Sequence, residues 1–167
     1  MSTRMSVSNH YDADVESVYA LSSDPAFIER KYAAQGATDI TIDSTPTDGG
    51  VRNVIKRKVT VDLPGFAQKV MQPTNTVVQT DEWQAADGNG RRVCRYTVEV
   101  QGVPSRISGT VTLAPDGAGT REDIEADVKV SIPLLGGKLE KFAADSGRKV
   151  LAEEAQFTSS ALASGSG

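Results

Sequence analysis

Arg57 and Asp81 are the two charged residues whose positions in the sequence most suggest a site inside the protein. Each alternates with apolar residues in a predicted β-strand, so each shares the phase of the side chains that face inward. A buried charge without a partner is costly, so we expect the two to pair with each other or with a glutamate of the last helix. Two alternatives are a bulge that turns both side chains to water and direct contact with a ligand.

Other polar or aromatic residues share the same inward phase. Trp83 and Tyr96 either stack on or hydrogen-bond to a ligand, or belong to the core with one satisfied polar atom. On the last helix, Val150 and Phe157 lie on the apolar stripe, and either Glu153 or Glu154 borders it; the spacing does not decide which. The inward-phase residues of the strands that we expect to contact a ligand are Asn53, Arg57, Gln79, Asp81, Trp83 and Tyr96.

A long connection over residues 63–71 carries apolar residues at helical spacing. Connections this long are usually functional or disordered. One interpretation is a lid over a cavity, with Phe66, Val70 and Met71 on the ligand; the other is a short helix that fills the end of a closed core. The spacing is compatible with both.

Nucleophilic and metal-dependent chemistry is disfavoured. His10 is the single histidine and faces away from the core by phase, whereas a catalytic serine or cysteine needs a base within about 3 Å. Cys94 is the single cysteine and lies in an inward phase, as a small core residue does. We therefore predict no catalytic residue, no metal and no other cofactor.

Composition narrows the class of protein further. The 167 residues carry 18 basic and 22 acidic side chains, a net charge of −4 that argues against nucleic acid as a partner. No apolar run reaches the ~20 residues of a membrane span, and the first residues lead straight into a strand pattern without an export signal. We expect a cytoplasmic monomer or weak dimer, with one domain over residues 1–163 and a flexible tail over residues 164–167.

The elements that must position these residues follow from periodicity. Alternation over residues 3–11 predicts a strand, and Asp12 or Asp14 then caps a short helix that ends near Ser22. A second helix begins at Pro25 and ends near Gly36. Six further strands separated by Gly-rich turns follow, and from Pro133 an amphipathic helix runs for about 30 residues. Hairpin-linked strands with segregated helices indicate an antiparallel α+β fold of about seven strands.

This order resembles the START-like helix-grip (SRPBCC) superfamily of lipid-transfer domains, pollen-allergen-type binders and polyketide cyclases. Three stretches are similar to one bacterial family of unknown function within this superfamily: residues 81–83, residues 131–140 at the entry to the last helix, and residues 150–157. The resemblance implies a curved sheet around the C-terminal helix, with a cavity between them. It specifies the fold more closely than the activity.

The expected function is therefore binding or transport of a small hydrophobic molecule, lipid-like or polyketide-like, in that cavity. Two alternatives remain open. One is a cyclase- or aromatase-type enzyme that holds an apolar substrate and uses Arg57, Asp81, Tyr96 and Glu153 or Glu154 for proton transfer. The other is a protein-interaction module with a filled core. An open cavity, converging titratable groups or an exposed apolar patch distinguish the three.

Overall fold

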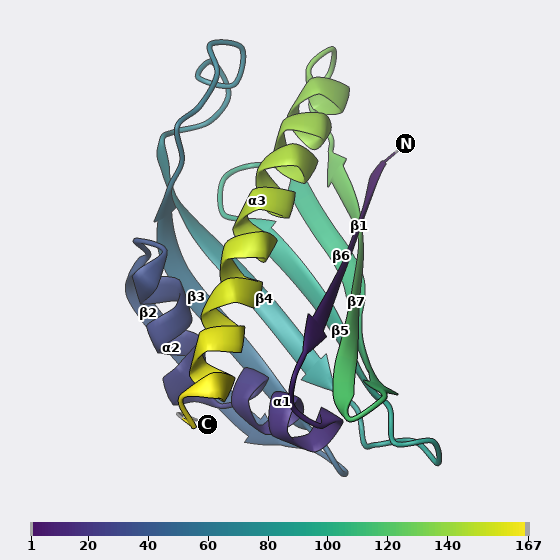
Figure 1. Ribbon diagram of the computed structural model, residues 1–167. Helices are drawn as coiled ribbons and strands as arrows, with labels where there is room; N and C mark the ends of the chain where they lie inside the picture. Colours follow the sequence, from purple (N-terminus) through teal and green to yellow (C-terminus); the bar gives the residue numbers. More distant parts are fainter. Residues whose placement is uncertain (1, 166–167) are drawn as a thin grey trace.

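A curved antiparallel sheet of seven strands holds a long C-terminal helix on its concave face (Figure 1). The computed structural model describes residues 2–165. The elements, in chain order, are β1 (Thr3–Tyr11), α1 (Val15–Ser22), α2 (Pro25–Ala34), β2 (Thr38–Pro46), β3 (Val51–Thr60), β4 (Thr74–Trp83), β5 (Arg92–Val100), β6 (Ser105–Asp116), β7 (Gly119–Val130) and α3 (Gly136–Ala163). The predicted α+β helix-grip fold is confirmed.

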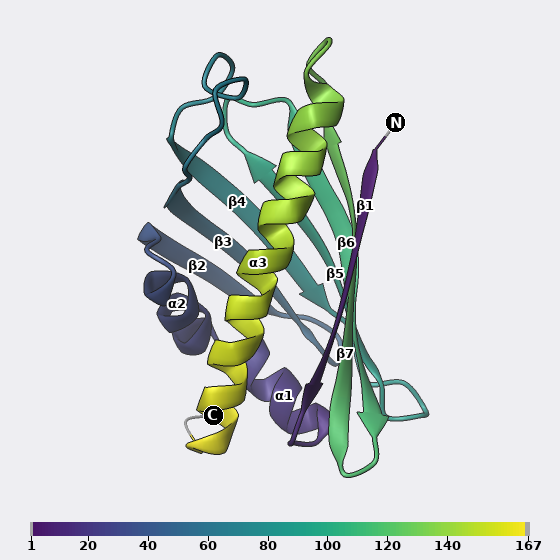
Figure 2. The ribbon, with the colours of Figure 1, turned by 45° about the horizontal axis from the view of Figure 1, so that its top comes forward.

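The strand order explains why α1 and α2 are needed. The order across the sheet is β1-β7-β6-β5-β4-β3-β2, so the two strands that precede and follow the helix pair lie at opposite edges. The helices α1 and α2 carry the chain from one edge to the other, beside the C-terminal end of α3 (Figure 2). The strands from β2 to β7 each neighbour the next in the chain and are joined by turns or short connections, except for the long connection between β3 and β4. β1 pairs with β7, far from it in the sequence.

Helix starts follow capping chemistry. Asp14 caps α1, with its Oδ1 accepting a hydrogen bond from the Ser17 amide at 2.8 Å. Asp24 caps α2, with Pro25 in the first turn. The start predicted for the last helix at Pro133 is wrong: α3 begins at Gly136, because Leu134 has a left-handed φ of 68° that a right-handed helix cannot contain.

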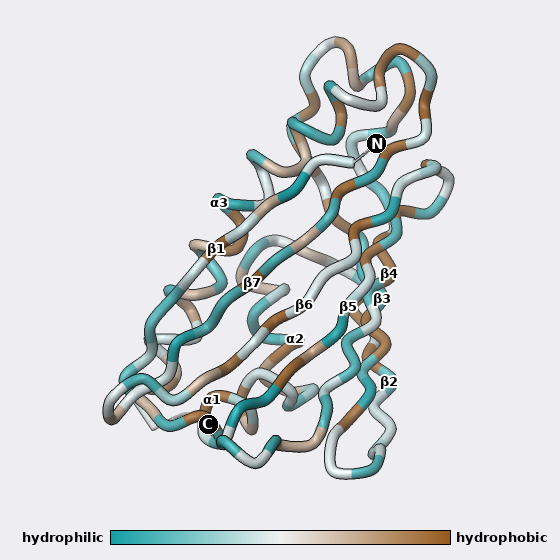
Figure 3. Tube along the Cα trace, turned by 90° about the vertical axis from the view of Figure 1, so that its right-hand side faces the viewer, coloured by the Kyte–Doolittle hydropathy of each residue, from teal (hydrophilic) through white to brown (hydrophobic). Residues whose placement is uncertain are grey.

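Strand phase is preserved across the middle of the sheet. β3 and β4 pair without a register shift, with Asn53 opposite Asp81 and Arg57 opposite Val77. The one irregularity in β2 lies between Thr38 and Thr41, away from these positions. The alternative in which a bulge turns Arg57 and Asp81 to water is therefore wrong; Arg57 is only 9% exposed. Along β5 and β6, hydrophobic and hydrophilic residues are interspersed (Figure 3). Successive side chains of a strand point to opposite faces of the sheet.

The connection between β3 and β4 fills one end of the core. Leu63 and Ala67 are buried against Leu139 of α3. The segment turns tightly, with the amides of Ala67 and Gln68 both donating to the Pro64 carbonyl oxygen. This is close to the second interpretation of residues 63–71, with turns in place of a short helix.

The C-terminal end of the chain bears on the predicted domain limits. α3 ends at Ala163, and residues 166–167 of the predicted tail lie outside the described part of the chain. Among the described helices, none combines the length and the apolar character that crossing a membrane requires.

Candidate functional site

A cavity of about 230 Å³ lies between the concave face of the sheet and α3. Typical ligand pockets occupy about 300–1,000 Å³, whereas a cavity of ~150 Å³ already admits benzene. The space therefore suits a small molecule. Its apolar lining comes from β1, β5, β6, β7 and α3: Met5, Val98, Ile107, Val111, Ile124, Val150, Leu151 and Ala155.

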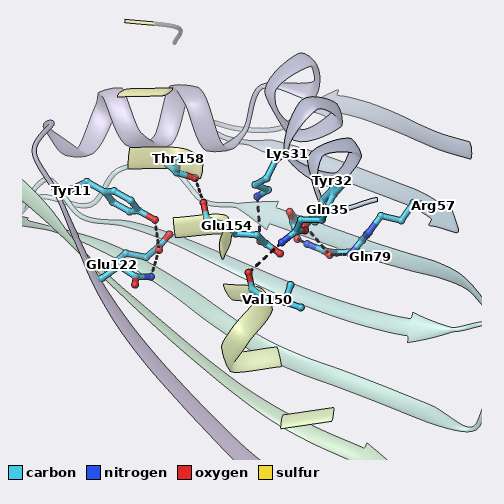
Figure 4. Close-up of polar contacts among 12 residues, drawn as sticks. Tyr11, Lys31, Tyr32, Gln35, Arg57, Gln79, Glu122, Val150, Glu154 and Thr158 are labelled. Atoms are coloured by element: carbon cyan, nitrogen blue, oxygen red, sulfur yellow. Dashed lines mark hydrogen bonds and ion pairs between the residues drawn. The ribbon is translucent and has the colours of Figure 1, made fainter. Parts of the chain in front are cut away.

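Polar side chains of α2, β3 and β4 line the same cavity and form a chain of contacts around Gln79 (Figure 4). Arg57 Nη2 donates to Gln79 Oε1 at 3.1 Å, and Tyr32 Oη donates to the same oxygen at 3.2 Å. The Arg57 guanidinium carbon lies 3.9 Å from the centroid of the Tyr32 ring. Gln79 Nε2 in turn donates to Asp81 Oδ1 at 2.9 Å. The amide of Gln79 thus separates the cation from the carboxylate.

The expected pairing of Arg57 with Asp81 or with a helix glutamate is therefore wrong. The strand register explains why Arg57 and Asp81 do not pair. The two residues lie four residue positions apart along the paired strands, which corresponds to about 13 Å. Gln79 has the same inward phase and lies between them. The helix glutamate has another partner.

That partner is Lys31, a residue that the sequence prediction missed. Lys31 Nζ of α2 lies 3.6 Å from Glu154 Oε1 of α3, and 5.0 Å from the centroid of the Tyr32 ring. Lys31 follows the buried Phe27 by four residues, so helical spacing puts it on the covered face of α2. This spacing was the available signal. The structure also settles which glutamate faces inward: Glu154 lines the cavity and Glu153 is exposed.

A second group of polar contacts lies where β1 and β7 meet. Asn9 Nδ2 and Tyr11 Oη both donate to Oε1 of Glu122, at 2.9 Å and 3.0 Å. Glu122 and Tyr11 line the cavity. Glu122 was also missed, although it precedes Ile124 by two residues and so shares its inward phase.

Burial dominates the electrostatics of the cavity. It raises the pKa of Asp81, although the Gln79 hydrogen bond and the charges of Lys31 and Arg57 oppose the shift. It also raises the pKa of Glu122, against the hydrogen bonds from Asn9 and Tyr11. Burial alone would lower the pKa of Lys31, but Tyr32 and the surrounding carboxyl groups together raise it. Lys31 therefore stays protonated, while two carboxyl groups of the cavity hold protons more tightly than usual.

The aromatic and sulfur side chains at the cavity have mixed roles. Trp83 is buried and packs edge-to-face on Tyr19, with ring centroids 5.4 Å apart, while it also lines the cavity. Burial raises the pKa of the Tyr96 phenol. Burial also raises the pKa of the Cys94 thiol well above its usual range, as expected of a core cysteine.

The predicted ligand-contact residues separate into two sets. Those that line the cavity are Arg57, Gln79, Asp81, Trp83, Tyr96, Val150 and Glu154. Those that lie elsewhere are Asn53, Phe66, Val70, Met71, Glu153 and Phe157.

Local contacts explain the positions of the second set, except for Glu153, which is exposed. Phe66, Val70 and Met71 surround Leu63 and Leu139, at the filled end of the core. Phe157 packs on Phe27, with ring centroids 5.6 Å apart.

Asn53 is buried and donates from Nδ2 to the Ser23 carbonyl oxygen at 3.0 Å, so it holds the α1–α2 junction. None of the residues in the second set lines the cavity.

Comparison with known proteins finds one matching family and uncharacterised relatives. A sequence model of one family, described as "Protein of unknown function (DUF2505)", matches residues 6–162. An uncharacterised protein of Mycobacterium tuberculosis is 22% identical over 161 residues, which cover 91% of this chain and 92% of that protein.

Solved structures share the fold. The protein TTHA0849 of Thermus thermophilus superposes with a TM-score of 0.63 at 19% identity, over 95% of this chain and 99% of that one. The Zhui aromatase/cyclase of a Streptomyces species superposes with a TM-score of 0.55 at 14% identity, over 96% of this chain and 87% of that one. At these identities the likeness establishes the helix-grip fold, as predicted, and leaves the activity open.

Proposed function

This chain belongs to the DUF2505 family of proteins of unknown function, and we propose that it binds a small, mainly apolar molecule in the cavity between its sheet and α3. The observation that carries the proposal is the cavity itself. A protein that only needed to pack its core would fill this space, because interiors approach the density of organic crystals. Instead, apolar walls surround a few placed polar groups, which is the usual composition of a ligand pocket.

The exposure of Val150 supports an opening of the cavity to solvent at this residue. It lines the cavity and is also 41% exposed, whereas the other apolar wall residues are buried or half-buried. Close by, Gln35 Nε2 of α2 donates to the Val150 carbonyl oxygen at 3.3 Å. We place the entrance between α2 and α3, beside this contact.

A second candidate, proton-transfer catalysis on the bound molecule, is favoured by one observation. Asp81 and Glu122 face the same cavity with pKa values raised by burial, and carboxyl groups of this kind act as general acids or bases nearer to neutral pH. The Zhui aromatase/cyclase has this fold, which makes the idea reasonable by analogy only. Nothing comparable favours an interaction module with a filled core.

Native mass spectrometry of protein purified from its own organism tests binding first. A stoichiometric small molecule, released on denaturation, would support the proposal and identify the chemistry. A clean apo mass, with no thermal shift against medium-chain and one- or two-ring aromatic compounds, would count against it.

A matched pair of variants locates the binding. Ala155→Phe adds a ring to the cavity wall, whereas Ala152→Phe adds the same ring to the exposed side of the same helix. Loss of binding in the first variant alone is expected. Equal binding in both would place the ligand elsewhere.

A further inference from the structure

Arg57 carries a buried hydrogen-bond donor that no residue in the described part of the chain accepts. Its Nη1 is buried and has no hydrogen-bond partner among the described residues, although the side chain is only 9% exposed. Nη2 is occupied by Gln79 Oε1, and the Tyr32 ring lies against the guanidinium. A buried donor left without an acceptor is destabilising, and the more so when it belongs to a charged group.

The charge of Arg57 is also uncompensated within the described chain. No carboxylate among residues 2–165 lies within ion-pair distance of its guanidinium. Asp81 faces the same cavity, but Gln79 stands between the two and occupies Asp81 Oδ1. The other cation of the cavity, Lys31, has its own partner in Glu154. Arg57 is therefore the cavity's unpaired cation.

The position of Arg57 makes this donor available to a ligand. The residue lines the cavity together with the apolar side chains of β5, β6 and α3. Figure 4 shows its side chain extending toward Gln79 and Tyr32, on the opposite side of Glu154 from Tyr11 and Glu122. An oxygen at this end of the cavity would meet a guanidinium, and a carbon chain or ring attached to it would meet apolar walls.

We propose that Arg57 binds the anionic oxygen of a small apolar acid, with Nη1 as the donor and the apolar part of the acid in the cavity. This inference rests on the proposed function, since it names the chemical class of the ligand for the same site. An ionised oxygen would accept a hydrogen bond from the unused donor and would also neutralise the unpaired charge. A neutral apolar molecule would do neither. The ~230 Å³ of space limits the apolar part to a medium-length chain or one to two rings.

Isothermal titration calorimetry with matched ligands tests the inference. Decanoate and decanol share an alkyl chain and differ in the anionic oxygen, and naphthoate and naphthylmethanol repeat the comparison with a ring system. The measured quantity is the ratio of alcohol Kd to acid Kd. Arg57→Gln keeps a polar side chain without the charge. Arg52→Gln is the matched control, because Arg52 lies on the outward phase of the same strand and is half exposed.

We expect Arg57→Gln to lower this ratio by about tenfold to a hundredfold, the effect of losing one hydrogen bond to a charged group. Its alcohol affinity and the ratio in Arg52→Gln should stay within about threefold of wild type. Should the variant not fold, nuclear magnetic resonance of wild-type protein with labelled arginine gives a second measure. The Arg57 guanidinium signal is expected to move with decanoate and to stay in place with decanol.

The outcomes separate the two proposals. Binding of the alcohols and acids with a ratio that Arg57→Gln leaves unchanged, or an Arg57 signal that ignores decanoate, overturns the inference and leaves the proposed function standing. Failure of all four compounds to bind wild-type protein overturns the proposed function for this size class, and the inference with it.

Discussion

Lys31 of α2 and Glu154 of α3 form a largely buried ion pair, with 3.6 Å between Nζ and Oε1 and side chains that are 14% and 15% exposed. The pair joins a helix near one edge of the sheet to the helix that the sheet surrounds. Beside it, Gln35 Nε2 donates to the Val150 carbonyl oxygen at 3.3 Å. These two polar contacts therefore join α2 to α3 at the proposed entrance.

Replacing Lys31 by methionine should destabilise the protein by about 2–4 kcal/mol, because Glu154 is left largely buried without a counter-charge. Urea unfolding followed by circular dichroism measures the change. Lys149→Met, at an exposed position of α3, is the control and should change stability by less than about 0.5 kcal/mol.

The double variant Lys31→Met with Glu154→Leu distinguishes the ion pair from the other contacts of the Lys31 ammonium. With both charges removed, most of the stability should return, because an apolar pair can replace a buried ion pair at little cost. A double variant as unstable as the single one would show that the Lys31 ammonium stabilises the protein through the Tyr32 and Phe27 rings rather than through Glu154.

Tyr11→Phe should cost about 1–2 kcal/mol, because it removes one of the two donors to Glu122 Oε1 and leaves that oxygen with Asn9 alone. Thermal and urea unfolding both report this loss. Tyr19→Phe is the matched control, since the Tyr19 ring packs on Trp83 and Arg92 through its π-face and edge. An equal loss in the two variants would contradict a specific role for the Tyr11 hydroxyl.

Strand phase was readable from sequence, and it accounts for what could be predicted of the site. Alternation placed Arg57, Gln79, Asp81, Trp83 and Tyr96 on the inward face, and the uninterrupted β3–β4 and β4–β5 registers keep them there. The same rule would have found Glu122, two residues before Ile124. Helical spacing from Phe27 would have found Lys31. The phase of a charged residue therefore indicates its orientation on strands and helices alike.

Which side chains of different elements pair with each other could not be predicted from the sequence. Whether Glu154 meets Arg57 or Lys31 depends on how α2 and α3 lie on the sheet, and single-element periodicity does not contain that information. The connection over residues 63–71 shows the same limit, since its apolar spacing suits a lid or a plug. In the structure, Phe66 and Met71 pack against the cluster that contains Leu63 and Leu139.

Cys94 should be nearly inert toward Ellman's reagent in the folded protein, because burial holds the pKa of its thiol well above the usual range and little thiolate forms. At pH 8 we expect labelling to be slower than in guanidinium-unfolded protein by about two orders of magnitude or more. Rapid and complete labelling of native protein would contradict this, and would show that the reagent enters the cavity in which Cys94 lies.

The pH dependence of stability provides a test of the buried carboxyl groups. Burial raises the pKa of Asp81 above its ordinary value of 3.8, so the folded state binds this proton more tightly than the unfolded state. The contribution of Asp81 to stability is therefore complete below about pH 3.8 and is lost as the pH rises through the folded pKa. Asp81→Asn cannot ionise and still presents an oxygen to Gln79 Nε2.

Asp81→Asn should accordingly gain stability relative to wild type as the pH rises from about 4 toward neutrality, with a difference that levels off once the wild-type carboxyl is ionised. Urea unfolding at a series of pH values measures this difference. Asp14→Asn gives the opposite sign, because hydrogen bonds from Ser17 lower the pKa of Asp14 and its stabilising effect is present only above that range. A stability difference for Asp81→Asn that stays constant with pH would contradict this prediction. It would show that Asp81 is ionised as readily in the folded protein as in the unfolded chain, and that burial does not raise its pKa.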